Sequence, residues 1–359
     1  MQQTQQVARG GWMYAPLLSV MVLMVGAVSV VMSAEDLPTP ATIHMQDGTV
    51  HDGVFVIREG LREVSWSRDD RMQARTNRPA SEVSRVEYSV PRNERDYQRG
   101  LGAFNSSNWS TAIDALGNAA SNSRYAFVRL DAHMKRAHAL MRLRRHDDAI
   151  AEINGVINDY GQWRQVIEAQ EMLARIHLAA DNVDGALAAY RGLRRAAGNY
   201  GTLNGAVATA RGALGEARIH TDANNNDQAL QVLRDAFANV PLAVAPAEHG
   251  AVAAALGQAL VASEDLDAAQ EIFRDLRFAG VPPTPRATAL LELGKMEQAA
   301  GNRIAAVDYL VMAAVLRGTE DEVRSEARRR ARALLNELGR DESIDALERR
   351  EYRNYAANL

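Results

Sequence analysis

The chain of 359 residues contains no cysteine, which excludes disulfide bonds, thiolate metal sites, cysteine nucleophiles and a lipid-bearing N-terminal cysteine. Its formal net charge at pH 7 is only −4, so the whole chain is drawn neither to nucleic acid nor to an anionic membrane. A serine-elbow motif, a phosphate-binding Walker loop and a dinucleotide fingerprint are also missing. The sequence therefore predicts a protein that is not an enzyme and that uses no cofactor.

Charge is also missing from one local stretch, because no charged residue occurs between Trp12 and Ala34. About 20 apolar residues span a bilayer as a helix, and this run exceeds the roughly 7–15 residues of a signal-peptide core. Small residues up to Ala34 would also suit a cleavage site, so an uncleaved anchor is favoured and a cleaved signal stays open. Arg9 before the run, and Glu35 with Asp36 after it, favour a cytoplasmic N-terminus. The remainder of the chain is then periplasmic, either anchored in the inner membrane or secreted.

Short alternating segments follow the uncharged run. They cover residues 43–45, 50–57, 61–67, 72–76 and 83–88, with turn residues such as Asp47-Gly48 and Glu59-Gly60 between them. Five short strands joined by hairpin turns predict a small β-barrel. The DGTVHDGVF stretch and the SEVSRVEY ending resemble Sm-like small barrels. A domain of this size is near the lower limit for independent folding, so we expect it to lean on the first helical repeat.

Small residues recur in a fixed register through the rest of the chain. An alanine returns about every 37 to 43 residues, at Ala112, Ala149, Ala186, Ala229, Ala269 and Ala306. Twelve positions earlier the residue is always small: Gly100, Ala137, Ala174, Ala217, Gly257 and Gly294. Four positions later it is always large: Leu116, Ile153, Tyr190, Leu233, Phe273 and Leu310. Small residues at this spacing let two antiparallel helices approach closely, so the register predicts six helical hairpins.

This register resembles that of the tetratricopeptide repeat family over about residues 95–316, since the family repeats a helical hairpin every 34 residues or so. The resemblance implies an α-solenoid of about six hairpins. Thr319 and Glu322 fit a capping box, Gly339 would end that helix, and Asp341 would cap a last one. The predicted organisation is a cytoplasmic stub with an anchor or signal at 1–34, a small β-barrel at 35–91, repeats at 92–318 and capping helices at 319–359.

The resemblance also indicates a binding surface. In tetratricopeptide hairpins the ninth consensus position of each first helix faces the concave groove. Here that column is Leu101, His138, Arg175, Arg218, Gln258 and Lys295, with Lys135 and Arg211 nearby. Three cations and a histidine favour acidic peptides or a C-terminal carboxylate, although the family's carboxylate-clamp asparagines are absent from the column. The candidate partner-binding residues are therefore His138, Arg175, Arg218, Gln258 and Lys295; the alternative is that they are simply exposed polar side chains.

Other polar groupings do not predict sites. His133 and His138 are five residues apart and so face different sides of a helix. The run that begins at Asp222 starts like a calcium loop, but Asp227 takes the glycine position and Leu233 that of the final glutamate. The arginines between 324 and 332 alternate with glutamates, which favours a solvated helix face over a nucleic-acid site. No metal ion and no nucleic acid are expected.

Taken with the export signal, the repeats predict a membrane-anchored scaffold in the cell envelope that binds protein or peptide partners in its concave groove. The alternative is a permanent structural subunit of an envelope complex. A charged, hydrated groove would favour reversible binding, whereas an exposed apolar patch above roughly 600 Å² would favour permanent assembly.

Overall fold

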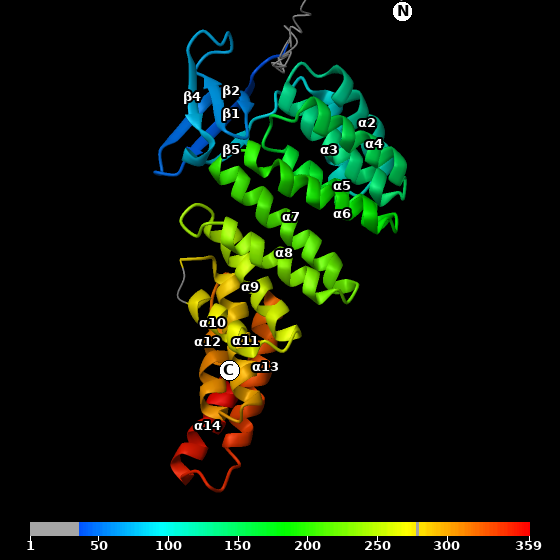
Figure 1. Ribbon diagram of the computed structural model, residues 1–359. Coiled ribbons are helices and arrows are strands. Elements are labelled where there is room, and N and C mark those ends of the chain that lie inside the picture. The colour runs from blue at the N-terminus through cyan, green and yellow to red at the C-terminus, as the bar shows by residue number, and fades with distance from the viewer. Residues whose placement is uncertain (1–35, 278–279) are drawn as a thin grey trace, which may run out of the picture. The chain divides into compact units, whose positions relative to one another are not determined.

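The computed structural model describes residues 36–277 and 280–359 (Figure 1). The uncharged run at 12–34, predicted to be an anchor or a signal, lies outside the described residues. None of the helices in the described part is long and apolar enough to cross a membrane. A small sheet comes first in the described chain, and a stack of helices follows it (Figure 1).

The sheet has five antiparallel strands, as the alternating segments predicted. They are β1 (Thr39–Met45), β2 (Val50–Glu59), β3 (Glu63–Ser67), β4 (Arg75–Pro79) and β5 (Val83–Tyr88), in the spatial order β4-β3-β2-β1-β5. The sheet is open, because β4 and β5 form its two edges and no described pairing joins them. The predicted closure into a barrel is therefore wrong, since β4 is almost entirely polar and offers no inner apolar face.

The fourth strand begins three residues later than predicted. The Asp69 carboxylate accepts a hydrogen bond from the Gln73 backbone N–H at 3.1 Å, and Met72 adopts a left-handed backbone with φ of 56°. Residues 72 and 73, which were predicted to begin the strand, therefore belong to this turn. The strand can therefore begin only at Arg75.

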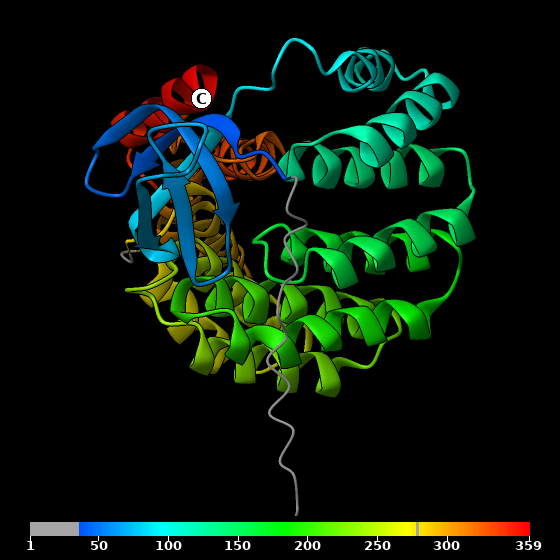
Figure 2. The same ribbon diagram turned by 90° about the horizontal axis from the view of Figure 1, so that it is seen from above.

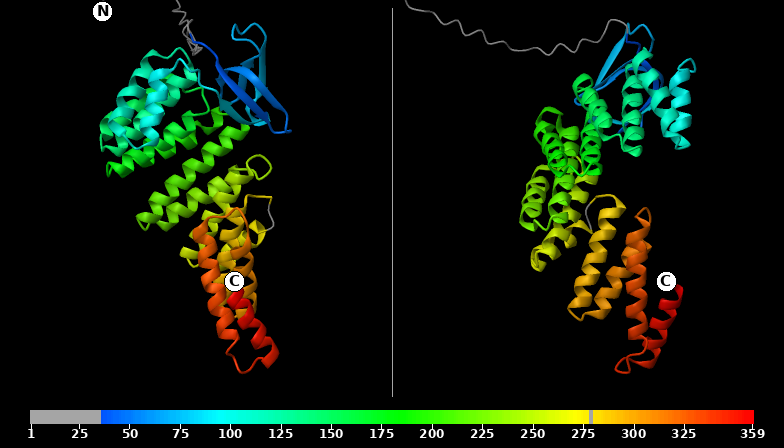
Figure 3. Two further views of the ribbon diagram at one scale, coloured as in Figure 1. Left: turned by 180° about the vertical axis from the view of Figure 1, so that it is seen from behind. Right: turned by 90° about the vertical axis from the view of Figure 1, so that its right-hand side faces the viewer.

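Six helical hairpins follow the sheet, which confirms the repeat prediction. They are α1 (Arg95–Asn105) with α2 (Trp109–Asn122), α3 (Ala126–Arg142) with α4 (His146–Asp159), α5 (Val166–Ala179) with α6 (Val183–Ala196), α7 (Thr202–Asp222) with α8 (Asn226–Asn239), α9 (Pro246–Ala262) with α10 (Leu266–Leu276), and α11 (Pro283–Ala299) with α12 (Arg303–Val315). Each helix contacts the next, and the first helices of neighbouring hairpins also touch (Figure 2, Figure 3). The hairpins therefore stack side by side in chain order.

The hairpin turns share one backbone feature, a single residue in the left-handed region. These residues have φ between 56° and 83°, and they are Ser107, Arg144, Asp181, Asn224, Glu264 and Gly301. Each of them precedes the repeated alanine by five positions. The turn geometry is therefore repeated along with the packing register.

In the hairpins whose small first-helix residue is a glycine, Gly100, Gly257 and Gly294 lie against the large residue of the second helix. All six repeated alanines are at most 1% exposed. A Cβ atom at Gly257 would lie 2.4 Å from the Phe273 ring, and one at Gly294 would lie 2.6 Å from Leu310. Tyr190 is the exception among the large residues, because it is only half-buried.

Two further helices, α13 (Asp321–Leu338) and α14 (Ala346–Asn358), follow the last hairpin. Gly339 ends α13 as predicted, but the capping box is not formed, because the Thr319 hydroxyl donates to the Leu316 carbonyl instead. Asp341 does not cap α14; Asp345 does, by accepting from the Leu347 N–H at 2.8 Å.

Asp341 instead stabilises the loop before α14. Its carboxylate accepts hydrogen bonds from Ser343 and Arg303. These bonds lower the pKa of Asp341 to about 2. Asp341, which was predicted to cap a helix, therefore connects this loop to Arg303 at the start of α12.

The sheet packs on repeats two, three and four, beyond the first repeat on which it was expected to lean. The turn between β2 and β3 inserts Leu61 among apolar side chains of α5, α6 and α7, and Leu61 is 5% exposed. The Asn204 side chain donates a 2.7 Å hydrogen bond to the Leu61 carbonyl. Tyr88 of β5 stacks on Phe127 of α3, with ring centroids 3.4 Å apart.

A buried carboxylate reinforces this junction. Glu59 is 3% exposed and accepts hydrogen bonds from Tyr88 at 3.1 Å and from Gln165 at 2.8 Å. It also pairs with Arg164 at 3.0 Å. Since a buried carboxylate without partners is costly, these contacts specify one seating of the sheet on the third repeat.

Gly257→Ala is expected to lower the free energy of unfolding by about 1–3 kcal/mol, because the added methyl group overlaps the Phe273 ring. Gly155→Ala is the matched control, since nothing lies within 4 Å of a Cβ atom at this position in α4. That control should stabilise the chain by about 0.5–1 kcal/mol. Chemical denaturation measures both, and equal effects would contradict the packing register.

Candidate functional site

The predicted column lies on the first helices of the six hairpins. Arg175, Arg218 and Gln258 are exposed, whereas Leu101, His138 and Lys295 are partly buried. Each column residue directly follows the small residue that packs inside its hairpin. Successive residues in an α-helix point about 100° apart. When the small residue packs inside the hairpin, the residue after it therefore lies nearer the surface. The surface they share is called the first-helix face below.

His138 contributes an aromatic contact to this face. Its ring centroid lies 5.3 Å from that of Phe104 and 6.1 Å from that of Trp109. The pKa of His138 is lowered by burial and by the nearby charges of Arg142 and Arg175. A histidine with a lowered pKa is mostly neutral at pH 7, so His138 adds little positive charge there.

Arg142 is a member of this face that sequence reasoning missed. Its guanidinium carbon lies 5.6 Å from the centre of the Trp109 ring, in a cation–π arrangement. It stands one helical turn after His138 on α3, and this spacing of four residues was the available signal.

Arg175 and Arg218 carry the exposed positive charge. Arg175 has no carboxylate within ion-pair distance in the part of the chain that the structure describes. Arg218 has only a 3.9 Å contact with Asp222, and its side chain is 84% exposed. Arg142, Arg175 and Arg218 are called the basic strip below.

The half-buried Tyr190 lies beside the basic strip. Burial and the Glu171 charge raise the pKa of its hydroxyl, whereas Arg175 and Arg218 oppose that rise. The hydroxyl makes no hydrogen bond to any described residue. It is therefore a free donor near two arginines.

The C-terminal part of the first-helix face is more acidic. Gln258 lines one cavity of about 230 Å³ together with Arg218, and another of about 400 Å³ together with Lys295. The Lys295 ammonium group pairs with Glu292 at 2.9 Å. Glu322 and Glu326 line the same cavity as Lys295. The structure thus places Lys295 among acids and separates it in character from the basic strip.

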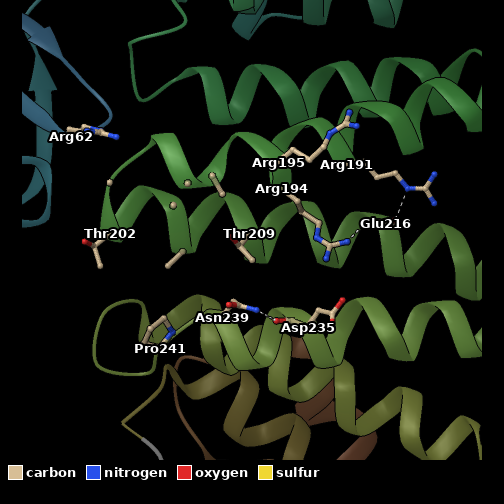
Figure 4. A pocket seen from close by; sticks show the side chains of 15 residues that line it. Arg62, Arg191, Arg194, Arg195, Thr202, Thr209, Glu216, Asp235, Asn239 and Pro241 are labelled. Atoms are coloured by element: carbon tan, nitrogen blue, oxygen red, sulfur yellow. Dashed lines mark hydrogen bonds and ion pairs between the residues drawn. The ribbon is translucent and has the colours of Figure 1, made fainter.

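A second cluster of arginines lies elsewhere and was not predicted. A cavity of about 1030 Å³ lies between the C-terminal ends of α6 and α8 and the part of α7 from Thr202 to Glu216, beside the β2–β3 turn (Figure 4). It is called the arginine cavity, and its charged lining residues are Arg62, Arg191, Arg194, Arg195, Glu216 and Asp235. The local run of arginines on α6 was visible in the sequence, but its proximity to Arg62 was not.

Glu216 anchors the inner end of the arginine cavity. It is 3% exposed and accepts hydrogen bonds from Arg191 at 2.7 Å and from Arg194 at 2.6 Å (Figure 4). Burial alone would raise its pKa, but the two arginines outweigh burial and the pKa is lowered. The buried His220 lies 3.8 Å away. Glu216 is therefore ionised at neutral pH and joins α7 to α6.

Among residues 36–277 and 280–359, no group of three or more histidines and carboxylates is placed to hold a metal ion. The polar groups of the two arginine clusters are mainly hydrogen-bond donors. Their arrangement suits the binding of anions.

No protein-family model matches the chain, and no curated protein matches it. Among solved structures it is similar to a thermophilic tetratricopeptide repeat protein of Thermus thermophilus, at 18% identity and a TM-score of 0.36 over 56% of this chain and 98% of that chain. It is also similar to the apo form of the quorum sensor NprR from B. thuringiensis, at 17% identity and a TM-score of 0.38 over 67% and 74%. A third similar structure is PilW, a type IV pilus biogenesis factor, at 14% identity and a TM-score of 0.40 over 64% and 92%.

Glu216→Gln is expected to lower the free energy of unfolding at pH 7 by about 1–3 kcal/mol, because two guanidinium groups lose their charged acceptor. The lowered pKa means that this contribution is complete above the ordinary pKa of glutamate and is lost as the pH falls through the folded-state value. The stabilities of wild type and variant should therefore converge in acid.

Urea denaturation across the acid range measures this convergence. Glu337→Gln is the control, since Glu337 is an exposed residue of α13 and its change should alter stability by less than about 0.5 kcal/mol. A constant difference between wild type and Glu216→Gln at every pH would contradict the role given to this carboxylate.

Proposed function

We propose that the chain is a non-catalytic scaffold that binds an acidic segment of a partner protein on the first-helix face. The six hairpins are tetratricopeptide-like in register and in packing. The observation that carries the proposal is the pair Arg175 and Arg218, which are exposed on consecutive first helices. Among the described residues Arg175 has no carboxylate within ion-pair distance, and Arg218 has only the 3.9 Å contact with Asp222. Guanidinium groups bind carboxylates through two parallel hydrogen bonds, which gives both affinity and orientation.

The spacing of the helices limits the kind of segment. Helices α5 and α7 contact each other, and packed helices have axes about 8–10 Å apart. A chain in the polyproline II conformation advances about 3.1 Å per residue and turns once in three residues. Two acidic side chains three residues apart then lie on one side of the segment, about 9 Å apart, and would meet Arg175 and Arg218. Tyr190 supplies a hydroxyl donor beside these two arginines. The acids that surround Lys295 would repel further acidic residues, so the site centres on repeats two to four.

The double change Arg175→Glu with Arg218→Glu should weaken binding of an acidic peptide by at least about tenfold, because each charge-assisted hydrogen bond contributes about 1.5–3 kcal/mol. The probe is a labelled peptide with two glutamates three residues apart, compared with its glutamine version by fluorescence anisotropy. Wild-type binding should also weaken as salt is added.

The matched control is Arg328→Glu with Arg332→Glu, two exposed arginines of α13 whose reversal changes the net charge equally. This control should bind the peptide like wild type, and circular dichroism should be the same for all variants. If the Arg175 and Arg218 variant binds as tightly as wild type at low and high salt, the first-helix face is not the site.

A permanent structural subunit of an envelope complex is the second candidate, and one observation favours it. Helix α12 exposes Ile304, Met312 and Val315, which are 58%, 50% and 62% exposed. Their spacing places them within about 80° of one another around the helix. Apolar side chains gathered on one helix face are typical of protein interfaces. A stable complex recovered at high salt, and disrupted by Met312→Lys, would support this candidate.

We also propose that the chain is exported to the cell envelope and held in the inner membrane by residues 12–34, with the N-terminus in the cytoplasm. The uncharged run supports this proposal. A cleaved signal, which would release the chain into the periplasm, is the alternative.

A reporter that works only outside the cytoplasm should be active when fused after Leu359. A reporter that works only in the cytoplasm should be inactive at the same position, and its activity would refute export. N-terminal sequencing of the recovered protein then separates the two alternatives, because a chain beginning near Glu35 would show cleavage.

A further inference from the structure

The arginine cavity is separate from the first-helix face, although helix α7 contributes to both. Thr202, Thr209 and Glu216 of α7 line the cavity, whereas Arg218 belongs to the basic strip. Glu216 and Arg218 are two positions apart and so point about 200° apart around the helix. The two clusters therefore lie on opposite sides of α7, and one bound molecule cannot fill both.

The cavity has an excess of positive charge. Its four arginines face two carboxylates, Glu216 and Asp235, which leaves two positive charges in excess. The Glu216 carboxylate already forms ion pairs with Arg191 and Arg194. Arg62 and Arg195 are exposed, and neither has a carboxylate within ion-pair distance in the described part of the chain.

Arg62 is held in place at the sheet end of the cavity. It directly follows the buried Leu61, and its Nε donates a 3.0 Å hydrogen bond to the Asn199 carbonyl. The two terminal nitrogens of the guanidinium group make no recorded hydrogen bond within the described residues. Because this bond fixes the guanidinium group through Nε and leaves both terminal nitrogens able to donate, Arg62 is well placed to bind an oxyanion.

The uncharged lining indicates what kind of anion fits. Apart from charged residues, the wall consists of glycine, alanine, threonine, one asparagine and one proline: Ala197, Gly198, Gly201, Thr202, Gly205, Ala206, Thr209, Asn239 and Pro241. Among these described residues there is no aromatic ring on which a nucleobase could stack and no large apolar side chain. The threonine hydroxyls and the Asn239 amide can donate further hydrogen bonds. The lining therefore suits a compact, highly polar ligand.

We propose that the arginine cavity binds a small polyanion whose charges are borne by phosphate or carboxylate groups. One charged group of the ligand would bind near Arg62 at the sheet end, and another near the arginines of α6, whose side chains Figure 4 shows. A volume of about 1030 Å³ accommodates a molecule with several such groups. Because Arg62 belongs to the β2–β3 turn, the ligand would link the sheet to the third and fourth repeats.

Isothermal titration of the full chain with tripolyphosphate and, separately, with citrate tests this proposal. Wild type should bind at least one of them, and Arg62→Ala with Arg195→Ala should weaken that binding by about tenfold or more. Binding of tripolyphosphate alone would identify a phosphate ligand, and binding of citrate alone would identify a carboxylate ligand; both results support the site.

Two controls locate the binding. Arg234→Ala removes an exposed arginine of α8 that pairs with Asp265 outside the cavity, and it should leave the affinity unchanged. The Arg175→Glu with Arg218→Glu variant should also bind the anion normally, because it alters only the opposite side of α7. Failure of wild type to bind either anion at millimolar concentration, or equal binding by the Arg62 and Arg195 variant, would overturn the proposal.

Discussion

The close packing of a buried small residue of the first helix inside each hairpin is the interaction on which the helical region depends. At Gly257 and Gly294 there is no room even for one methyl group. This packing fixes the rotation of both helices about their axes. The residue after the small one must then point outward, which is why Arg175 follows the buried Ala174 and Arg218 follows the buried Ala217. The packing register and the binding surface are thus consequences of the same alternation.

The sheet extends this constraint to the other side of the repeats. Leu61 joins the apolar core of the third and fourth repeats, and Glu59 is satisfied only by side chains from both regions. Detaching the turn between β2 and β3 from the repeats would therefore expose apolar surface and remove the hydrogen-bond partners of a buried carboxylate. Arg62 lies on that same turn, so the sheet both secures the repeats and completes the wall of the arginine cavity.

Charge is arranged differently on the two sides of helix α7. On the first-helix face the arginines are spread along consecutive repeats, which suits an extended acidic segment. In the arginine cavity they come from separate elements, with Arg62 at the sheet end and the α6 arginines toward the other end (Figure 4). Glu216 shows why arginines cannot simply be counted, because a single buried carboxylate engages two of them through hydrogen bonds. Lys295 is a similar case in the predicted column, because its ammonium group already forms an ion pair with Glu292.

The sequence by itself determined the five strands, the six hairpins and the positions that pack inside them, because these follow from local periodicity and from residue size at fixed spacing. It did not determine that the sheet stays open. It also did not determine the delayed start of β4, which depends on the hydrogen bond of Asp69, or the cap of α14, where Asp345 accepts the capping bond and Asp341 bonds to Ser343 instead. Only the tertiary structure decided that Arg142 stands over Trp109 and that Arg62 lines the same cavity as the arginines of α6. Those residues are brought together by the packing of separate elements, and no local pattern records which elements will meet.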